Sequence, residues 1–593
     1  APPSRQRTST TNYPFRMLSA FRPHSRIKLL AISVGLIMAI FVVRLFYLQV
    51  IEHSKYVSVA NSEQIKRLSI PATRGQIYMM DEGEPVHVVL NETVYTMFVD
   101  PQYIEKKQDV IKAINDVAGG NTVKNFAKLL DKTDTRYQVV ARNVTRKQAE
   151  LIKKKDLKGI GFQAVSRRVY PEKTLGAQVL GFVNYADRGQ YGIEEKFDNE
   201  LKGKDGVLQS VTDVSNVPLT IGNRNIDIPA QNGKNIVLTI DRNVQAYTEQ
   251  ALASGLKKIG ATKGSAVVMD PQTGKILAMA NCPTYNPGEY YKVTNADAFN
   301  NGVISTPYEP GSVMKTFTVA TGIDTGTITP YSTYNNTDYI QVEDRTITNA
   351  TKGQTGNITF DHAYTWSLNT GMVTIAKRLG GGDINSRARE ILYKYYHDKF
   401  GLGQATGVEL AGEATGLLDK PNLGDGDAVR YSNMTFGQGM DPTMMQVATA
   451  FSSVINGGTY YHPTVLAGTV DDNGDLKVAA SKKPTEHVIS ANTSNEVRKM
   501  AIRARSAFYG ANDKKGYIIG GKTGTSQTIV NGEYTFDQTI GTYLGFGGDT
   551  KPRYVIMVQA SAPGRAIAGD MPIPIFTDIS NWMIDYLKLQ PKG

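Results

Sequence analysis

An uncharged apolar run near the N-terminus limits what this chain can fold into more than any other feature of its sequence. Residues 29–43 read LLAISVGLIMAIFVV, and after Arg44 the apolar stretch continues to Ile51. About 20 apolar residues in a helix cross the hydrocarbon core of a bilayer, and an arginine near the end of the span can extend to the interface. The sequence therefore predicts a single transmembrane helix over residues 29–51.

Two other interpretations of this run fit less well. A buried helix of a soluble protein would be expected to show a polar face, and residues 29–43 show none. A cleaved signal peptide ends in small residues, whereas the residues at 45–48 are bulky. We therefore expect an uncleaved signal anchor.

The charge of the chain is concentrated before this run. Residues 1–28 contain six basic side chains and no acidic one, and they carry more than half of the net charge of +11. Basic residues flank the cytoplasmic end of a membrane span, so we expect residues 1–28 to form a cytoplasmic tail and the rest to lie outside. The body of the protein is then lightly charged, and we expect no binding of nucleic acid.

Cysteine and histidine usage excludes several kinds of site. The single cysteine, Cys282, rules out an internal disulfide or a multi-cysteine metal site, and the seven histidines lack ligand spacing such as His-Glu-x-x-His. We expect Cys282 to be a small buried side chain and His362 to lie on a helix surface. Without paired cysteines, an extracellular region fits a bacterial envelope protein better than a disulfide-rich eukaryotic one. No metal is expected.

Beyond the span, the chain divides into two regions that differ in amino-acid composition. Residues 52–230 are charged and heterogeneous, with helical patches at 106–116 and 146–156 and a strand near 138–141. Residues 231–593 are richer in Gly, Ala, Thr and Tyr. The patterns favour one α+β domain in each region.

The second region has the clearer pattern of strands and helices. Residues 264–280 form two apolar runs around a turn that contains Pro and Gly, which is typical of a hairpin. Further strands are expected at 543–547 and 554–560, and an amphipathic helix at 575–587. Because strands occur at both ends of the region, we expect a sheet that joins those ends.

One motif suggests phosphate binding but lacks the necessary context. Residues 516–523 match the pattern G-x-x-x-x-G-K-[ST] of phosphate-binding loops. That loop needs a helix that begins at its Lys-Thr, whereas residues 523–528 are rich in β-branched side chains and favour a strand. We therefore expect Lys522 to lie on a strand, without a bound nucleotide.

The same lysine belongs to a set of residues suited to acyl transfer. Ser312 follows a Pro-Gly pair at the predicted start of a helix, and Lys315 lies three residues later on the same face. A serine needs a nearby base to act as a nucleophile, and a lysine serves as that base only when burial or a second cation lowers its pKa. Lys522 is the candidate for that cation.

A third motif strengthens this interpretation. An isolated Ser-x-x-Lys is common by chance and is more often a helix cap followed by a solvated lysine. Residues 367–369 add a Ser-x-Asn, so that Ser-x-x-Lys, Ser-x-Asn and Lys-Thr-Gly occur in the order typical of serine acyltransferases that act on penicillin-like acyl groups. The catalytic candidates are therefore Ser312, Lys315, Ser367, Asn369 and Lys522.

With these motifs the chain resembles the class B penicillin-binding proteins, which are monofunctional peptidoglycan D,D-transpeptidases. The resemblance extends from Arg22 to the C-terminal helix. Other family motifs occur as Arg74-Gly75-Gln76-Ile77, Arg168-Val169-Tyr170-Pro171, Gly192-Ile193-Glu194 and Phe436-Gly437-Gln438-Gly439. One departure follows Tyr78, where the family usually shows Asp-Arg-Asn-Gly and this chain has Met79-Met80-Asp81-Glu82-Gly83.

The resemblance implies a fold and a domain order. It implies an N-terminal transmembrane helix, an α+β pedestal domain over residues 52–230, and an α+β penicillin-binding transpeptidase domain over 231–593. The transpeptidase domain would contain a mixed antiparallel sheet flanked by helices. Arg74, Gly75, Arg168 and Glu194 would mark the pedestal.

The resemblance also implies roles for the catalytic candidates. Ser312 would attack the carbonyl between the last two D-alanines of a stem peptide, and Lys315 would take its proton. Ser367 would pass a proton to the leaving amine, and Asn369 would help to hold Lys315 and the substrate. Lys522 would bind the substrate's terminal carboxylate.

Three residues around Lys522 complete the implied site. Thr523, Gly524 and Thr525 would bind the substrate or a β-lactam. The backbone N–H groups of Ser312 and Thr525 would form an oxyanion hole. No organic cofactor is implied, and an amine of a neighbouring stem peptide would resolve the acyl-enzyme to form a crosslink.

The implied partners are D-Ala-D-Ala stem peptides, β-lactam antibiotics, a membrane glycosyltransferase and division proteins, at the bacterial cytoplasmic membrane. Glu-Pro-Gly-Ser at 309–312 and the Asn at 369 are typical of division members, whereas elongation members more often have Pro-Pro-Gly-Ser and Asp. The sequence thus favours septal synthesis over elongation.

Two other functions stay open at this point. A tethered carboxypeptidase or β-lactamase would pass the acyl group to water, but would not need a pedestal of about 180 residues, more than a typical domain. A non-catalytic β-lactam sensor would be expected to have more spans or a cytoplasmic effector domain, for which a tail of 28 residues is too short. A scaffold that activates a partner glycosyltransferase need not keep all five catalytic candidates.

Overall fold

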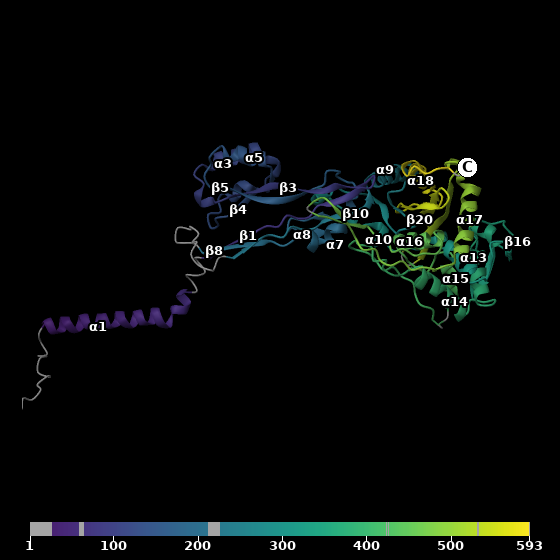
Figure 1. Ribbon diagram of the computed structural model, residues 1–593, viewed down its shortest axis with the longest axis horizontal. Helices are drawn as coiled ribbons and strands as arrows, with labels where there is room; N and C mark the ends of the chain where they lie inside the picture. Colours follow the sequence, from purple (N-terminus) through teal and green to yellow (C-terminus); the bar gives the residue numbers. More distant parts are fainter. Residues whose placement is uncertain are drawn as a thin grey trace, which may run out of the picture. The chain divides into compact units, whose positions relative to one another are not determined.

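The computed structural model describes residues 26–57, 65–211, 226–422, 424, 426–471, 473–530 and 533–591 (Figure 1). The chain forms two compact units, Ala1–Pro71 with Asp205–Ala230, and Ala72–Lys204 with Gln231–Gly593. Most of the expected basic tail, residues 1–25, lies outside the described residues. The expected domain boundary at residue 230 stays a prediction.

The first unit contains the apolar helix. Helix α1 (Arg26–Phe46) continues into a wider turn, η1 (Tyr47–Ile51), and none of the side chains from Ile27 to Ile51 is buried. In the described part of the chain this is the one helix long and apolar enough to cross a membrane. The predicted helix is confirmed, and it is consistent with a single-pass membrane anchor.

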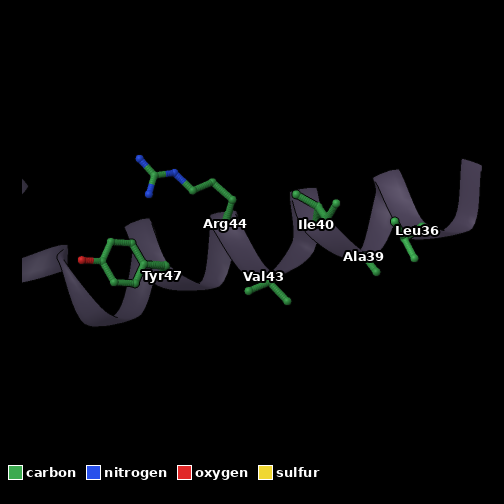
Figure 2. Close-up of a pocket in the computed structure, with 6 residues that line it drawn as sticks. All are labelled: Leu36, Ala39, Ile40, Val43, Arg44 and Tyr47. Atoms are coloured by element: carbon green, nitrogen blue, oxygen red, sulfur yellow. The ribbon is translucent and has the colours of Figure 1, made fainter. Parts of the chain in front are cut away.

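Arg44 lies as expected for a residue near the end of a span. Figure 2 shows it on the same helix as Leu36, Ala39, Ile40, Val43 and Tyr47, with its side chain directed along the helix towards Tyr47. Its guanidinium carbon lies 5.5 Å from the centre of the Tyr47 ring. This direction allows the charge to extend towards a membrane interface while the chain of carbons stays along the helix.

The first unit also contains a small antiparallel sheet. Its three strands are β1 (Ile65–Ile70), β8 (Gly206–Val211) and β9 (Ile226–Ile228), in the order β1-β8-β9.

The second unit begins with a sheet built around one long strand. Strand β3 (Glu84–Val99) pairs antiparallel with β2 (Ile77–Asp81), β4 (Gln138–Val144) and β5 (Ile160–Val169). Strand β10 (Asn235–Asp241) extends this sheet through a parallel pairing with β2. β17 (Leu466–Val470) and β18 (Leu476–Val478) complete its far edge.

Two amphipathic helices cover part of this sheet, as the sequence predicts. Helix α3 (Lys107–Ala118) buries Ile114, and α5 (Arg146–Lys153) buries Ile152 against residues of β3 and β4. Thr145 and Gln148 form a capping box that begins α5, in which each side chain bonds the backbone N–H of the other residue.

A five-stranded sheet of the second unit joins strands from both ends of the 231–593 region, which confirms that expectation. Its order is β12 (Ile276–Cys282), β11 (Lys263–Met269), β21 (Pro552–Ser561), β20 (Glu533–Gly548) and β19 (Ile518–Val530), all antiparallel. β19 contains Lys522, so the phosphate-loop pattern lies on a strand, as expected.

Both faces of this sheet are buried. Ile556 and Val558 of β21 pack with α9 (Arg242–Ile259) and α18 (Ile573–Tyr586), whereas Val555 and Met557 pack with helices on the other face. Those helices are α11 (Lys315–Asp324), α16 (Met444–Ile455) and α17 (Ala491–Phe508). Alternate residues of one strand thus serve two cores.

Candidate active site

The first motif lies on a tight turn that leads into a buried helix. The sequence predicts a helix start at Ser312, and the structure has a short 3-10 turn, η6 (Gly311–Met314), followed by α11. Gly311 adopts a φ of 60°, and a Cβ there would lie 2.4 Å from the carbonyl oxygen of Thr525. The turn therefore needs glycine so that Ser312 can approach β19 closely.

Two lysines from distant parts of the sequence meet at one hydroxyl. Nζ of Lys315 lies 3.1 Å from Oγ of Ser367, and Nζ of Lys522 lies 2.9 Å from the same atom. Lys315 also donates to the carbonyl oxygen of Ser367 at 2.6 Å. Lys315 is 1% exposed and Lys522 is 3% exposed. The structure thus brings together the three predicted residues Lys315, Ser367 and Lys522.

The surroundings of these lysines favour their neutral forms. No carboxylate pairs with either amine among the residues that the structure describes. Burial, and then the nearby charge of Lys522, lower the pKa of Lys315 well below its ordinary value. Burial lowers the pKa of Lys522 to about 7. A lysine in this setting can accept a proton near neutral pH, as the sequence argument requires.

The nucleophile candidate is available for reaction. Ser312 is half-buried, and within the described residues its hydroxyl makes no hydrogen bond. It lies in the turn immediately before α11, which begins at Lys315, so both motif residues belong to one rigid segment.

Ser367 adopts an unusual backbone conformation between two helices. It follows α12 (Phe360–Thr365) and precedes α13 (Asn369–Leu379), with a φ of 57°. A left-handed conformation costs about 1–3 kcal/mol for a non-glycine residue and is retained where the surroundings impose it. Here it directs both the carbonyl oxygen and the hydroxyl of Ser367 to Lys315.

Asn369 makes a contact that the sequence does not predict. Its Nδ2 donates to the carbonyl oxygen of Thr348 at 2.9 Å. The expected hydrogen bond to Lys315 is absent from the described residues, where Lys315 bonds to Ser367 instead. The structure therefore brings Asn369 beside the site but fixes its side chain from another segment.

Strand β19, the last strand of the five-stranded sheet, contains Lys522, Thr523, Gly524 and Thr525. The outer edge of β19 makes no backbone hydrogen bond to another described strand, so it can accept an extended peptide. A Cβ on Gly524 would lie 2.8 Å from the carbonyl oxygen of Pro310, which leaves no room for a side chain. The hydroxyl oxygen of Thr525 accepts a hydrogen bond from the N–H of Gly569 at 2.9 Å, so the O–H group of Thr525 can still donate a hydrogen bond.

The two expected oxyanion-hole groups lie on adjoining segments. Ser312 is the second residue of η6, and the first N–H groups of a helix have no partner within it. A Cβ on Gly311 would lie 3.1 Å from the backbone nitrogen of Thr525, so this N–H is next to the nucleophile turn.

Sequence reasoning assigned no role to the residues that hold this turn in place. The N–H of Gly311 donates to the carbonyl oxygen of Gly437 at 3.0 Å, and the N–H of Gly439 donates to the Glu309 carboxylate at 2.7 Å. Gly437 and Gly439 belong to the Phe-Gly-Gln-Gly motif. The motif was visible in the sequence, but its contact with the 309–311 segment was not.

Three of the four predicted pedestal residues meet in space, and the fourth, Gly75, packs against another segment. Arg74 donates to Oε2 of Glu194 at 2.6 Å, and Arg168 donates to Oε1 of the same carboxylate at 2.7 Å. Arg74 also lies 2.7 Å from Oδ1 of Asp198, which the sequence analysis missed. Gly75 lies so close to the backbone of Lys234 that a Cβ would be 1.9 Å from its carbonyl oxygen.

Two known domains match this chain in order along the sequence. The Penicillin-binding Protein dimerisation domain matches residues 69–238, and the Penicillin binding protein transpeptidase domain matches residues 264–581. The second match alone covers more than half of the chain.

Individual proteins are similar over most of their length. Penicillin-binding protein PbpB of Mycolicibacterium smegmatis is 31% identical over 501 residues, which cover 82% of this chain and 74% of the relative. The probable peptidoglycan D,D-transpeptidase PenA of Neisseria gonorrhoeae is 25% identical over 589 residues, which cover 96% and 94%. The crystal structure of a peptidoglycan synthetase from Bifidobacterium adolescentis superimposes with a TM-score of 0.70 at 25% identity, covering 89% of this chain and 98% of the other.

The domain matches, the shared fold and the three motifs gathered around Ser367 agree on one family. Its members use peptidoglycan as substrate and bind β-lactams. This chain belongs to the class B penicillin-binding proteins, and it is a serine-type peptidoglycan D,D-transpeptidase.

Proposed function

We propose that Ser312 is the acylated nucleophile, that Lys315 and Ser367 form the proton relay that serves it, and that Lys522 beside them binds the substrate. The observation that carries this proposal is the pair of buried lysines on one hydroxyl, without a carboxylate partner in the described residues. A neutral Lys315 amine can act as general base, and burial, together with the charge of Lys522 when that lysine is protonated, favours this neutral form.

In the first half-reaction, Oγ of Ser312 attacks the carbonyl carbon between the two terminal D-alanines. Its proton passes to Nζ of Lys315, and the oxyanion is stabilised by the backbone N–H groups of Ser312 and Thr525. The C–N bond then breaks, and the hydroxyl of Ser367 delivers a proton to the leaving amine. Lys315 restores that proton to Ser367, so the products are free D-alanine and an ester on Ser312.

In the second half-reaction, an amine of a neighbouring stem peptide attacks the ester carbonyl. Lys315 takes a proton from this amine and returns one to Oγ of Ser312 as the ester bond breaks. The new amide is the crosslink. Carboxypeptidase or β-lactamase activity would follow the same steps with water in place of the amine.

The donor peptide would bind as an added strand along β19. The terminal carboxylate would contact Lys522 and the hydroxyls of Thr523 and Thr525, and Gly524 would allow the peptide backbone to approach. Backbone groups at the edge of β19 would pair with the peptide, because unpaired strand edges bind extended chains. Asn369 would hold an amide of the donor.

The setting that we propose is the outer face of a bacterial cytoplasmic membrane during septal synthesis. The six basic residues within positions 1–28 support a cytoplasmic N-terminus. The Glu-Pro-Gly-Ser and Ser-x-Asn forms of the motifs support division over elongation. The pedestal would meet a membrane glycosyltransferase and division proteins.

The nucleophile is tested by intact-protein mass after incubation with a penicillin. The full chain in detergent is compared with Ser312→Ala and with Ser305→Ala, a partly buried serine seven residues earlier that serves as a matched control. We expect one penicillin mass on the wild type and on Ser305→Ala, and none on Ser312→Ala.

Each other result would change the proposal in a defined way. An adduct that persists on Ser312→Ala would move the nucleophile elsewhere. Hydrolysed drug without an adduct would indicate a β-lactamase, and intact drug without an adduct would favour a scaffold. The cellular role is tested by depletion in the host, where filaments without septa support division and rounded cells support elongation.

A further inference from the structure

Helix α13, which carries Asn369 in its first turn, begins without a local cap. Its N-cap residue is Leu368, which has no side-chain hydrogen bond to the helix. The first N–H groups of a helix have no partner within it and need one from elsewhere. The N–H of Thr370 finds that partner in Oδ1 of Asn349, 21 residues earlier, at 3.0 Å. The cap therefore comes from a different segment of the chain.

That segment is an insertion of two small sheets between α11 and α12. Strands β13 (Thr333–Asn336) and β16 (Gly356–Thr359) enclose a hairpin formed by β14 (Tyr339–Val342) and β15 (Arg345–Thr348). Asn349 follows the hairpin directly, and Asn336 ends β13. Both side chains are 1% exposed.

A network of hydrogen bonds fixes the orientation of these two amides. Nδ2 of Asn349 donates to Oδ1 of Asn336 at 3.2 Å and to Oδ1 of Asp338 at 3.1 Å. Oδ1 of Asn336 also accepts the hydroxyl of Thr370 at 2.8 Å, and its Nδ2 donates to the carbonyl oxygen of Gln354 at 2.6 Å. In each side-chain amide the oxygen faces donors and the nitrogen faces acceptors. A rotation that exchanged the oxygen and the nitrogen would therefore break these hydrogen bonds.

The hairpin also fixes the side chain of Asn369. The carbonyl oxygen of Thr348, the last residue of β15, accepts Nδ2 of Asn369 at 2.9 Å. A carbonyl oxygen only accepts, so Nδ2 and not Oδ1 must face Thr348. Within the described residues, Oδ1 and the second hydrogen of Nδ2 make no other hydrogen bond and can bind a peptide group. The bond to Thr348 fixes on which side the acceptor and the donor lie.

We propose that the β14–β15 hairpin is the positioning element of the Ser-x-Asn motif. Asn349, held by Asn336, fixes the start of α13. Thr348 fixes the orientation in which the side-chain amide of Asn369 faces the donor peptide. This inference rests on the substrate-binding role proposed above for Asn369. Asn349 and Asn336 act through Asn369 and do not contact the substrate.

The test measures acylation in two parts on the full chain in detergent. A fluorescent penicillin is mixed with protein over a range of concentrations, and the saturation curve separates its dissociation constant from the acylation rate constant. For Asn349→Ala and Asn336→Ala we expect a rate constant about 10- to 100-fold lower, because displacements of an ångström cost this much. The dissociation constant should stay within about threefold, since most binding contacts lie on β19.

The chain offers a matched control one residue away. Asn335 lies on the same strand as Asn336 but is exposed, and Asn335→Ala should acylate like the wild type. The fraction of molecules that become labelled is counted separately. If the asparagines matter only for folding, that fraction falls while the rate constant per labelled site stays at the wild-type value, which would overturn the inference.

A double variant tests the network directly. Asn349→Asp keeps an oxygen for the N–H of Thr370 but places a second carboxylate beside Asp338. Adding Asp338→Asn restores a hydrogen bond with its direction reversed and keeps the charge of the wild type. We expect the double variant to acylate faster than Asn349→Asp alone; an equal or slower rate would argue against the network.

The results also separate this inference from the proposed function. A wild type that is not labelled would remove the proposed role of the whole site. A wild type that is labelled, with Asn349→Ala acylating within twofold of it, would leave the nucleophile in place and remove only the hairpin's role.

Discussion

The pedestal and the active site each bury two basic side chains. The charges are compensated by carboxylates in the pedestal but, among the residues that the structure describes, not in the active site. In the pedestal, Arg74 and Arg168 share the carboxylate of Glu194, and Arg74 also contacts Asp198. In the active site, Lys315 and Lys522 share only the hydroxyl of Ser367.

The difference shows how burial can either fix a charge or remove it. Although burial opposes the charged form of Arg74, its carboxylate partners raise the pKa above the ordinary value. Without such partners, burial lowers the pKa of Lys315 and Lys522. Arginine suits the first task because it stays protonated in proteins, and lysine suits the second because its proton can leave. One cluster is therefore structural and the other is chemical.

The largest effect should come from Lys315→Arg, which gives the active site a permanently charged side chain like those of the pedestal. An arginine cannot take the proton of Ser312, so we expect acylation by penicillin to fall by about 10²- to 10⁴-fold, the usual contribution of a general base. The measurement is the acylation rate constant, with Lys394→Arg, at an exposed lysine, as the control. A loss below tenfold would mean that Lys315 is not the base.

The converse change removes the compensating charge from the pedestal. Glu194→Gln leaves the buried Arg168 with a neutral amide in place of its carboxylate, while Arg74 keeps Asp198, and an uncompensated buried charge costs about 3–5 kcal/mol. We expect the free energy of unfolding to fall by this amount, measured by urea denaturation of the full chain in detergent. The acylation rate per labelled site should not change, and a large change there would contradict the separation of the two clusters.

A smaller effect should appear in the pH dependence of stability. The folded-state pKa of Lys522 is about 7, against an ordinary value of 10.5, so between these values the unfolded state binds more protons. Raising the pH through this window therefore stabilises the wild type, by at most about 1.4 kcal/mol per pH unit for one group.

Comparison with Lys522→Met isolates this contribution. The free energy of unfolding of the wild type should rise relative to that of the variant from pH 7 to pH 9, and the gap should stay constant below pH 7. Urea midpoints at each pH provide the measurement. Parallel curves for the two proteins would show that Lys522 keeps its proton in the folded state.

The smallest effect should come from a neighbour of the pedestal cluster. Arg167 pairs with Glu92 at 2.6 Å, but both side chains are substantially exposed, whereas Arg168 is buried. Exposed pairs contribute less than about 1 kcal/mol, so Arg167→Ala should barely alter the free energy of unfolding. Arg168→Ala should lower it several times more. Equal losses would mean that burial does not distinguish these adjacent arginines.

Local patterns predict the parts of the molecule that depend on local sequence. The apolar run gives helix α1, the hairpin at 264–280 and the strand at Lys522 are confirmed, and the order of three motifs identifies the residues that meet at Ser367. Each of these depends on residue type and short-range spacing.

The features that the sequence does not predict depend on contacts between distant segments. The left-handed conformation of Ser367 is imposed by Lys315 and by two flanking helices, and no local pattern announces it. Asn336 and Asn349 lie in short strands without a motif, and their importance becomes visible only when α13 begins at a leucine without a cap. The joining of Arg74 to Asp198 likewise depends on how the second unit folds.

The open edge of β19 has a consequence for how the enzyme can change over generations. An edge strand recognises its ligand through main-chain amides, which are the same for every amino acid. A point substitution replaces side chains but leaves these groups as they were. In the proposed binding mode, resistance to a mimic that pairs with this edge would require a change in the side chains beside it or a shift of the strand, and the close contacts of Gly311 and Gly524 leave little space for such a shift.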